Sequence, residues 1–190
     1  MHSTREIRQE PALTRFIWLL PLVFLVAGTV IRFLAFRFQL PDANPVEYVS
    51  RLCRWDCIWY IGMAEDGYSR FPVPDRVAAA NWAFFPFYPL LVGTLGKLIP
   101  IPTIWLASLL SLALSYAAIV AAWPLLRSRR AYVLYAAFIL AGPFSIYFTT
   151  FMTEVMFVLL ATLVFRFLHR SDYLAAAGAS ALLSATRIVG

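Results

Sequence analysis

Long apolar runs, separated by short polar segments, dominate this sequence. An α-helix needs about 20 such residues to cross the roughly 30 Å hydrocarbon core of a bilayer at 1.5 Å per residue. The runs predict five membrane-spanning helices, which are residues 16–38, 103–126, 131–150, 154–168 and 173–190. The third is interrupted by Gly142-Pro143, and the fourth is the shortest. We therefore expect an all-α fold, a polytopic transmembrane helix bundle, with residues 1–190 as a single membrane domain.

One further apolar run, at residues 83–101, is ambiguous. Pro86 and Pro89 interrupt it, and only about 14 apolar residues precede Lys97, a length that is often re-entrant or interfacial. The run is either a re-entrant segment or a sixth span, and the position of the next basic residues favours the re-entrant segment. If it crossed, the basic cluster Arg127, Arg129 and Arg130 would lie outside, against the tendency of positive charge to stay cytoplasmic.

This topology has a consequence for the polar residues. With the N-terminus and the basic clusters on the cytoplasmic side, the 39–82 loop lies on the non-cytoplasmic side. The Thr153-Glu154 corner and Arg187 then face the same side, so three polar features that are distant in sequence are expected to converge on one site.

Composition agrees with a membrane protein. The chain is 62% hydrophobic and 14% charged, whereas a soluble domain carries about a quarter charged residues. The net charge of +6 does not indicate nucleic acid, because the basic residues lie at the ends of apolar runs rather than in a stripe. Membrane lipid is the expected surrounding partner.

Six of the ten acidic residues lie in the 39–82 loop, which makes it the main water-facing segment. Trp55, Ile58, Trp59, Gly62 and Met63 recur at helical spacing. They predict an interfacial helix whose indole-bearing face lies at the membrane surface. Gly67 is a plausible end for that helix.

Asp56 and Tyr60 lie four residues apart, on another face of the same helix. A carboxylate held at the membrane surface can serve as a general base for an acceptor hydroxyl. Asp56 can equally be the N-cap of the helix, a position that Asp favours. The residues alone leave both roles open.

Glu154 and Arg187 are charged residues next to apolar runs. Glu154 is favoured in a first helical turn by the helix dipole, but an ionisable group in an apolar region is usually functional. Arg187 can extend to the interface, pair with Glu154 or bind a lipid phosphate through its planar guanidinium. We expect the two side chains to pair near Asp56, because either one alone in a partly dry site carries a desolvation cost.

Three other features have ordinary interpretations. Cys53 and Cys57 lack the further ligands that zinc would need, so they are expected to be two small residues near the membrane surface. Arg32, near the end of the first run, is expected to extend along the helix to the interface. Ala177, Ala181 and Ala185 recur every four residues, which predicts a face packed inside the bundle.

Several motifs resemble a known family. Arg54-Trp55-Asp56, with Trp59-Tyr60 and Gly67-Tyr68, is similar to the first-loop motif of GPI mannosyltransferase II, the PIG-V type. Three further elements of that family have similar counterparts here: the aromatic segment 84–91, Gly142-Pro143-Phe144 followed by Thr153-Glu154, and the Thr-Arg-x-x-Gly element at 186–190. One position departs from the family pattern, because Met152-Thr153 replaces the commoner aromatic-Ser/Thr pair.

The resemblance implies a glycosyltransferase of the GT-C superfamily. The expected donor is a polyprenyl- or dolichyl-phosphate sugar, such as mannose, and the expected acceptor is a lipid-linked or envelope glycan. By this resemblance, Asp56 corresponds to the acidic residue of the first loop to which catalysis is assigned. We expect Trp55, Tyr60, Glu154 and Arg187 to bind substrate. No resident cofactor is indicated, and the need for a divalent metal is open.

Two alternatives accompany this interpretation. The chain resembles an N-terminal portion of such enzymes, so it could be an inactive fragment, or a second polypeptide could complete the bundle. A non-enzymatic membrane protein, either a transporter half or an assembly partner, is the rival class. The expected location is the plasma membrane in a bacterium or the endoplasmic reticulum membrane in a eukaryote.

Overall fold

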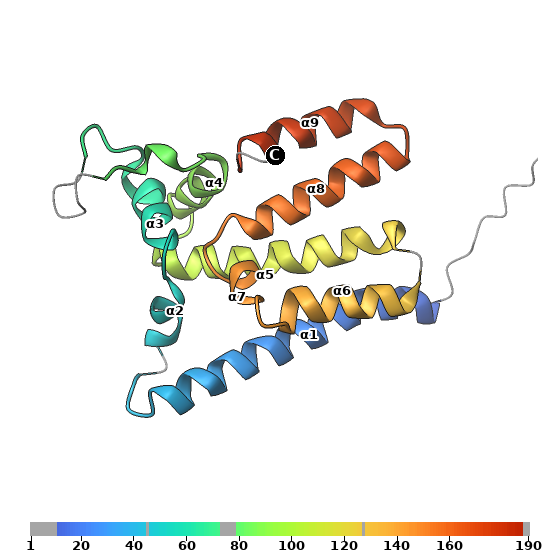
Figure 1. Cartoon of the computed structure of the whole chain (residues 1–190), viewed down its shortest axis with the longest axis horizontal. Helices are drawn as coiled ribbons and strands as arrows, with labels where there is room; N and C mark the ends of the chain where they lie inside the picture. The colour runs from blue at the N-terminus through green and yellow to red at the C-terminus, as the bar shows by residue number, and fades with distance from the viewer. Residues whose placement is uncertain (1–10, 45, 73–78, 127, 188–190) are drawn as a thin grey trace, which may run out of the picture.

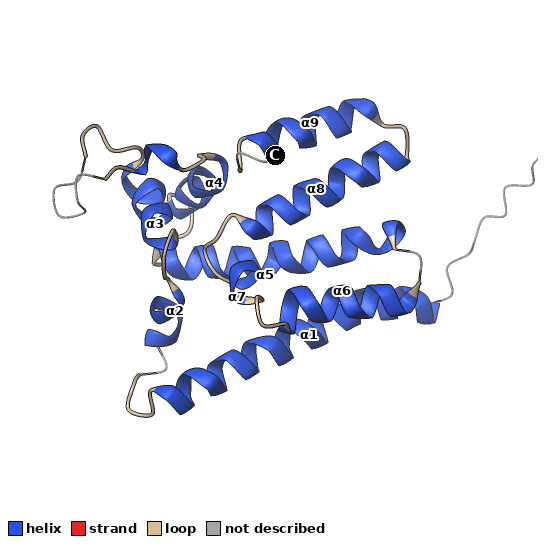
Figure 2. Ribbon diagram, viewed as in Figure 1, coloured by secondary structure: helices blue, strands red, loops and turns tan. Residues whose placement is uncertain are grey.

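A computed structural model describes residues 11–44, 46–72, 79–126 and 128–187. The regular structure of these residues is helical (Figure 2), which confirms the all-α prediction. The α-helices are α1 (Pro11–Gln39), α2 (Glu47–Leu52), α3 (Cys57–Asp66), α4 (Phe87–Gly96), α5 (Thr103–Ala122), α6 (Arg129–Ala141), α7 (Ile146–Thr149), α8 (Glu154–His169) and α9 (Tyr173–Ser184). Arg127 and residues 188–190, which belong to the expected basic cluster and fifth span, lie outside the described residues.

The long helices run side by side as one bundle (Figure 1). Helix α5 packs against α8, α8 packs against α9, and α1 packs against α6. Helices α2, α3 and α4 lie together at one end, on the left of Figure 1, which we call the loop end. The α5–α6 and α8–α9 connections lie at the opposite end. The described segments between the end of α1 and the start of α5, which are residues 40–44, 46–72 and 79–102, therefore lie at the loop end.

Two helices are long and apolar enough to cross a membrane by length and composition, namely Leu13–Gln39 and Thr103–Leu125. Helices α6 and α9 are shorter than the predicted spans, with 13 and 12 residues, whereas α8, with 16 residues, matches the predicted 154–168 within one residue. At 1.5 Å per residue, 16 residues span only about 24 Å. The 131–150 run is not one helix, because Gly142 is extended and Pro143 cannot donate an intrahelical hydrogen bond.

The helices enclose two apolar clusters. One lies between α3, α4, α5 and α8 and is centred on Tyr88 and Phe151, whose rings meet edge to face at 5.3 Å. The Tyr88 hydroxyl is satisfied by Ser111, at 2.7 Å. The other cluster joins α1, α5 and α6 around Tyr132, whose hydroxyl donates to the Ile17 carbonyl at 2.7 Å. Both buried tyrosines thus have partners, as polar groups in an apolar interior must.

Two predictions about packing are wrong. In α9 the buried residues are Ala176 and Ala179, whereas Ala177 and Ala181 are exposed. The side of α9 that faces α8 is therefore not the side that carries the four-residue alanine repeat. In α3 the buried side carries Cys57, Tyr60 and Met63, so Met63 packs into the core instead of joining the indole-bearing face.

Arg32 also differs from its prediction. Its guanidinium turns inward and donates to the Ser145 hydroxyl at 2.6 Å, to the Leu140 carbonyl at 3.3 Å and to the Thr29 hydroxyl at 3.2 Å. The break after α6 brings these acceptors beside α1. A charged donor in an apolar bundle gains more from such acceptors than from stretching toward the interface.

Candidate functional site

A cavity of about 190 Å³ opens at the loop end, where four separate segments meet. Asp56 and Tyr60 come from the start of α3, Thr153 and Glu154 from the start of α8, and Arg187 from the end of α9. The remaining lining residues are Ala83, Phe84, Phe85 and Thr186. The polar features that are distant in sequence thus share one cavity.

Glu154 and Arg187 form an ion pair, with 3.0 Å between Oε1 and a terminal guanidinium nitrogen. Helix α8 begins at Glu154, and the turn after α9 brings Arg187 opposite it. The Glu154 side chain is 28% exposed and that of Arg187 is 44% exposed. The predicted pairing is confirmed, and the pair remains accessible from the cavity.

Asp56 stands at the N-cap position of α3, but its side chain makes no capping hydrogen bond. Its backbone is already helical, with φ −65° and ψ −23°, whereas a capping residue usually has extended geometry that aims its side chain at the next turn. Asp56 is exposed. The helix-cap interpretation is therefore wrong, and the Asp56 carboxylate lines the cavity without capping α3.

Tyr60 lies one turn after Asp56 and is buried. Its hydroxyl is 3.4 Å from the Thr153 hydroxyl, and either group can be the donor. Burial raises the pKa of the Tyr60 phenol, and the neighbouring Asp56 and Glu154 carboxylates add to that rise. Tyr60 therefore stays protonated and can donate a hydrogen bond within the cavity.

The charges of the cavity sum to a negative value. Asp56 and Glu154 each contribute one negative charge, and Arg187 contributes one positive charge. Because Arg187 already neutralises Glu154 at 3.0 Å, the Asp56 carboxylate is the uncompensated group. Such a carboxylate can accept a proton from a bound hydroxyl.

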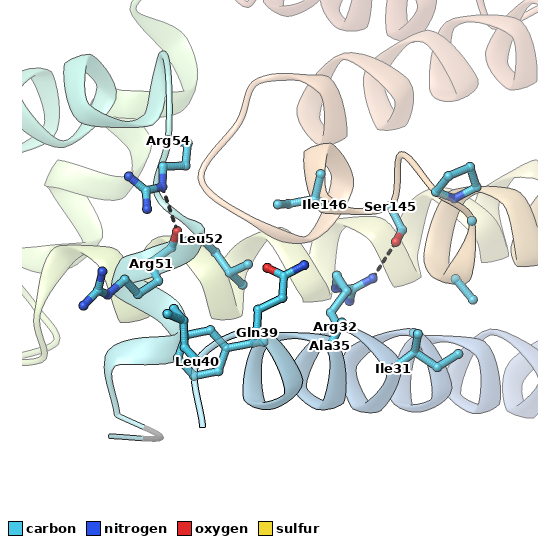
Figure 3. A pocket seen from close by; sticks show the side chains of 15 residues that line it. Ile31, Arg32, Ala35, Gln39, Leu40, Arg51, Leu52, Arg54, Ser145 and Ile146 are labelled. Carbon is cyan, nitrogen blue, oxygen red and sulfur yellow. Dashed lines mark hydrogen bonds between the residues drawn. The ribbon is translucent and has the colours of Figure 1, made fainter. Parts of the chain in front are cut away.

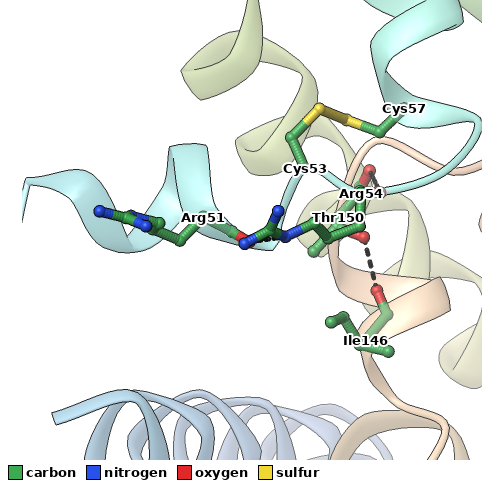
Figure 4. The surroundings of a disulfide bond; sticks show 7 residues. Arg51, Cys53, Arg54, Cys57, Ile146 and Thr150 are labelled. Atoms are coloured by element: carbon green, nitrogen blue, oxygen red, sulfur yellow. Dashed lines mark hydrogen bonds between the residues drawn. A yellow bond between two sulfur atoms is a disulfide. The ribbon is translucent and has the colours of Figure 1, made fainter. Parts of the chain in front are cut away.

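A disulfide joins Cys53 to Cys57 immediately before α3, with 5.3 Å between the Cα atoms (Figure 4). The expectation of two unlinked small residues is thus wrong. The bond closes a short loop that contains Arg54, Trp55 and Asp56, and so restrains the backbone on both sides of Asp56. A spacing of four residues does not by itself indicate such a bond, which forms here because the loop between α2 and α3 brings the two Cα atoms to disulfide distance.

Trp55 lies outside the cavity that it was expected to line. Its backbone adopts a left-handed conformation, with φ +51°. The indole stacks on Tyr147, with 5.8 Å between the ring centroids. The backbone reversal is uncommon for a bulky residue, and no sequence pattern indicated it.

Phe84, Phe85 and Thr186 line the cavity but were not among the predicted site residues. Phe84 stacks on Trp59 at 5.9 Å and meets Tyr60 edge to face at 5.4 Å. The density of aromatic residues around Asn81–Pro89 was the available signal for an aromatic wall. Within the described ranges, no group of three or more His, Cys, Asp or Glu side chains is arranged to hold a metal ion.

Comparisons with protein-family models, curated proteins and solved structures gave no match for this chain.

Proposed function

We propose that this chain belongs to an integral membrane glycosyltransferase, which transfers a hexose, in the first instance mannose, from a polyprenyl-phosphate sugar to a lipid-linked or envelope glycan. One observation carries the proposal: Asp56, free of any capping bond, shares a cavity with the Glu154–Arg187 pair. Three of the four motifs that resemble the PIG-V type family contribute charged residues to that cavity.

The reaction would follow from the charges of the cavity. The Asp56 carboxylate accepts the proton of an acceptor hydroxyl as its oxygen attacks the anomeric carbon. The bond from that carbon to the phosphate oxygen breaks, and the lipid phosphate leaves with the electron pair. Because phosphate is a good leaving group, the site does not need the second acid that a glycosidase uses on an alkoxide. In-line attack would invert the anomeric centre.

The other polar groups would position the substrates. Tyr60 donates a hydrogen bond because its phenol stays protonated, and the aromatic wall at Phe84 offers a face for a sugar ring or a prenyl chain. Arg187 would hold phosphate with the part of its planar guanidinium that Glu154 leaves unused.

The proposal includes a polytopic bundle of the GT-C kind with the cavity on the non-cytoplasmic side. Helix α6 begins and α8 ends opposite the cavity (Figure 1), and Arg129, Arg130, Arg166 and Arg170 lie at those helix ends. A basic cluster of this kind is expected on a cytoplasmic side, although Arg51 and Arg54 lie at the cavity end. The Cys53–Cys57 disulfide lies at the cavity end, and disulfides persist mainly outside the reducing cytosol.

The test is hexose transfer by membranes that contain the full chain, with polyprenyl-phosphate mannose as donor. Replacing Asp56 with Asn removes the base, so we expect transfer to fall by about 10²–10⁴-fold. Because the carboxylate makes no capping bond, thermal stability should be unchanged. Glu65→Gln is the matched control, since Glu65 is exposed on the same helix and does not line the cavity. Full activity of Asp56→Asn would exclude Asp56 as the base.

A further inference from the structure

A second and larger cleft, of about 620 Å³, opens between α1, α2 and the segment that follows α6 (Figure 3). This volume lies in the usual range of small-molecule sites, about 300–1,000 Å³. Arg32 and Gln39 come from α1, Arg51 and Arg54 from the end of α2 and just beyond it, and Ser145 from the far wall. The cleft shares no lining residue with the acid cavity.

The charge of this cleft is positive. Three arginines line it, and no carboxylate is among its described lining residues. Arg51 is paired with Glu47 on the same helix, at 3.1 Å. Arg32 and Arg54 instead donate only to neutral oxygens, Arg54 to the Arg51 carbonyl at 3.2 Å. Two guanidinium charges are therefore left without a counter-ion in the described structure.

Of these two arginines, Arg32 has the greater need of a counter-ion. It lies on the longest apolar helix, where a charge without a counter-ion is costly. Its Nε is buried and makes no hydrogen bond, and its terminal nitrogens donate to the neutral oxygens of Ser145, Leu140 and Thr29. An anion in the cleft would supply the counter-ion that the described residues do not provide.

The surface next to the cleft is apolar. Ile31 lines the cleft, and it is followed along α1 by Leu34 and Phe38, which are 60% and 90% exposed. An occupant that carries an anionic head and a long apolar chain would match both parts, with its head between the arginines and its chain along α1. Guanidinium geometry suits phosphate oxygens in particular, because it can bind two at once.

We infer that this cleft binds the phosphate headgroup of a membrane lipid. Arg32 binds the phosphate from the inner wall, and Arg54, whose side chain would turn from the Arg51 carbonyl toward the cleft, adds positive charge at the mouth. The apolar chain lies against α1. Because Arg54 and Asp56 flank Trp55 in one disulfide-closed loop, a lipid bound here would also restrain the loop that carries Asp56.

Native mass spectrometry of the detergent-solubilised full chain, titrated with phosphatidic acid, tests the inference. We expect Arg54→Gln and Arg32→Gln each to weaken binding about tenfold or more, as loss of a charge-assisted contact does. Arg70→Gln is the charge-matched control, because Arg70 is exposed and outside the cleft. Arg54→Gln also guards against misfolding of the Arg32 variant, since the Arg54 side chain makes one hydrogen bond, to a neighbouring carbonyl.

Three further ligands define the chemistry. Phosphatidylcholine should bind more weakly than phosphatidic acid, because its choline offsets the phosphate charge. Inorganic phosphate should not displace the lipid at equal concentration, because it has no chain to lie against α1. A polyprenyl phosphate should compete with phosphatidic acid, because both carry a phosphate and an apolar chain. Wild-type affinity for phosphatidic acid in the Arg32/Arg54 double variant, or equal affinity for phosphatidylcholine, would overturn the inference. Neither result depends on Asp56 or on transfer activity.

Discussion

Glu154 and Arg187 illustrate how single residues set the character of the cavity. Each lies at a helix end that faces the other, and their 3.0 Å contact leaves Asp56 as the uncompensated charge. Because Arg187 is nearly half exposed, water screens the pair and its contribution to stability is small, of the order of that of surface ion pairs. The positions of the charged groups therefore matter more to chemistry than to folding.

Arg187→Lys should consequently impair transfer more than stability. Lysine keeps the charge but loses the planar fork that can contact Glu154 and a phosphate at once, so we expect transfer to fall by about tenfold or more, the loss of one charge-assisted contact. Thermal unfolding measured beside the transfer assay should change little. Arg170→Lys, at the opposite end of the bundle, is the control. An active Arg187→Lys, or a loss explained by unfolding, would argue against a phosphate contact.

The sequence was informative about some of these residues and not about others. The sequence predicted that Asp56, Glu154 and Arg187 lie close together, and their shared cavity confirms that proximity. The position of the Trp55 side chain could not be predicted. Its left-handed backbone occurs inside the disulfide loop, and no sequence pattern indicates that geometry. Arg32 was misplaced because its acceptors, such as Ser145, are more than 100 residues away.

At the scale of elements, the contact between α3 and α4 holds Asp56 and Tyr60 in place. Gly93 of α4 meets the backbone of Ala64 in α3, and a Cβ on Gly93 would run into the Ala64 carbonyl. Since a backbone atom cannot rotate away, any larger residue must push the two helices apart. Gly93 thus sets the distance between α3 and α4.

Gly93→Ala should therefore destabilise the fold by about 1–3 kcal/mol, the usual cost of overpacking. Gly62→Ala is the matched control, because a Cβ on Gly62, in α3, would meet nothing within 4 Å. We expect that control to be neutral, or to stabilise by up to about 1 kcal/mol through its helix propensity. Thermal unfolding of both variants in one detergent measures the difference. If Gly93→Ala is as stable as Gly62→Ala, the close contact between α3 and α4 does not exist.

Element boundaries were predictable where apolar length alone decides them. The run at 103–126 corresponds to the helical stretch Thr103–Leu125, and Gly67 ends α3 with a φ of +79° as expected. The run at 131–150 was not resolved correctly, since hydropathy does not register the break that Gly142-Pro143 imposes on the backbone. The packed side of α9 also escaped prediction, because both of its sides carry small residues.

At the scale of the whole molecule, the distribution of charge and covalent linkage defines two unlike ends. Arginines lie at both ends of the bundle, but the disulfide and the acid cavity lie at the loop end. The described helices between α1 and α5, which are α2, α3 and α4, lie at the loop end, and α4 is only ten residues long. A disulfide at the cavity end agrees with the proposed orientation, because disulfides persist mainly outside the reducing cytosol.

The proposed function depends most on that orientation, and accessibility of single cysteines to a membrane-impermeant maleimide on intact cells measures it directly. Both native cysteines are in the disulfide, so a cysteine at Glu65, at the loop end, or at Ser171, at the opposite end, can be followed alone. Both positions are exposed. The account predicts labelling of Glu65→Cys from outside, and of Ser171→Cys only after permeabilisation. Labelling of Ser171→Cys but not Glu65→Cys on intact cells would contradict it, because the acid cavity would then face the cytoplasm.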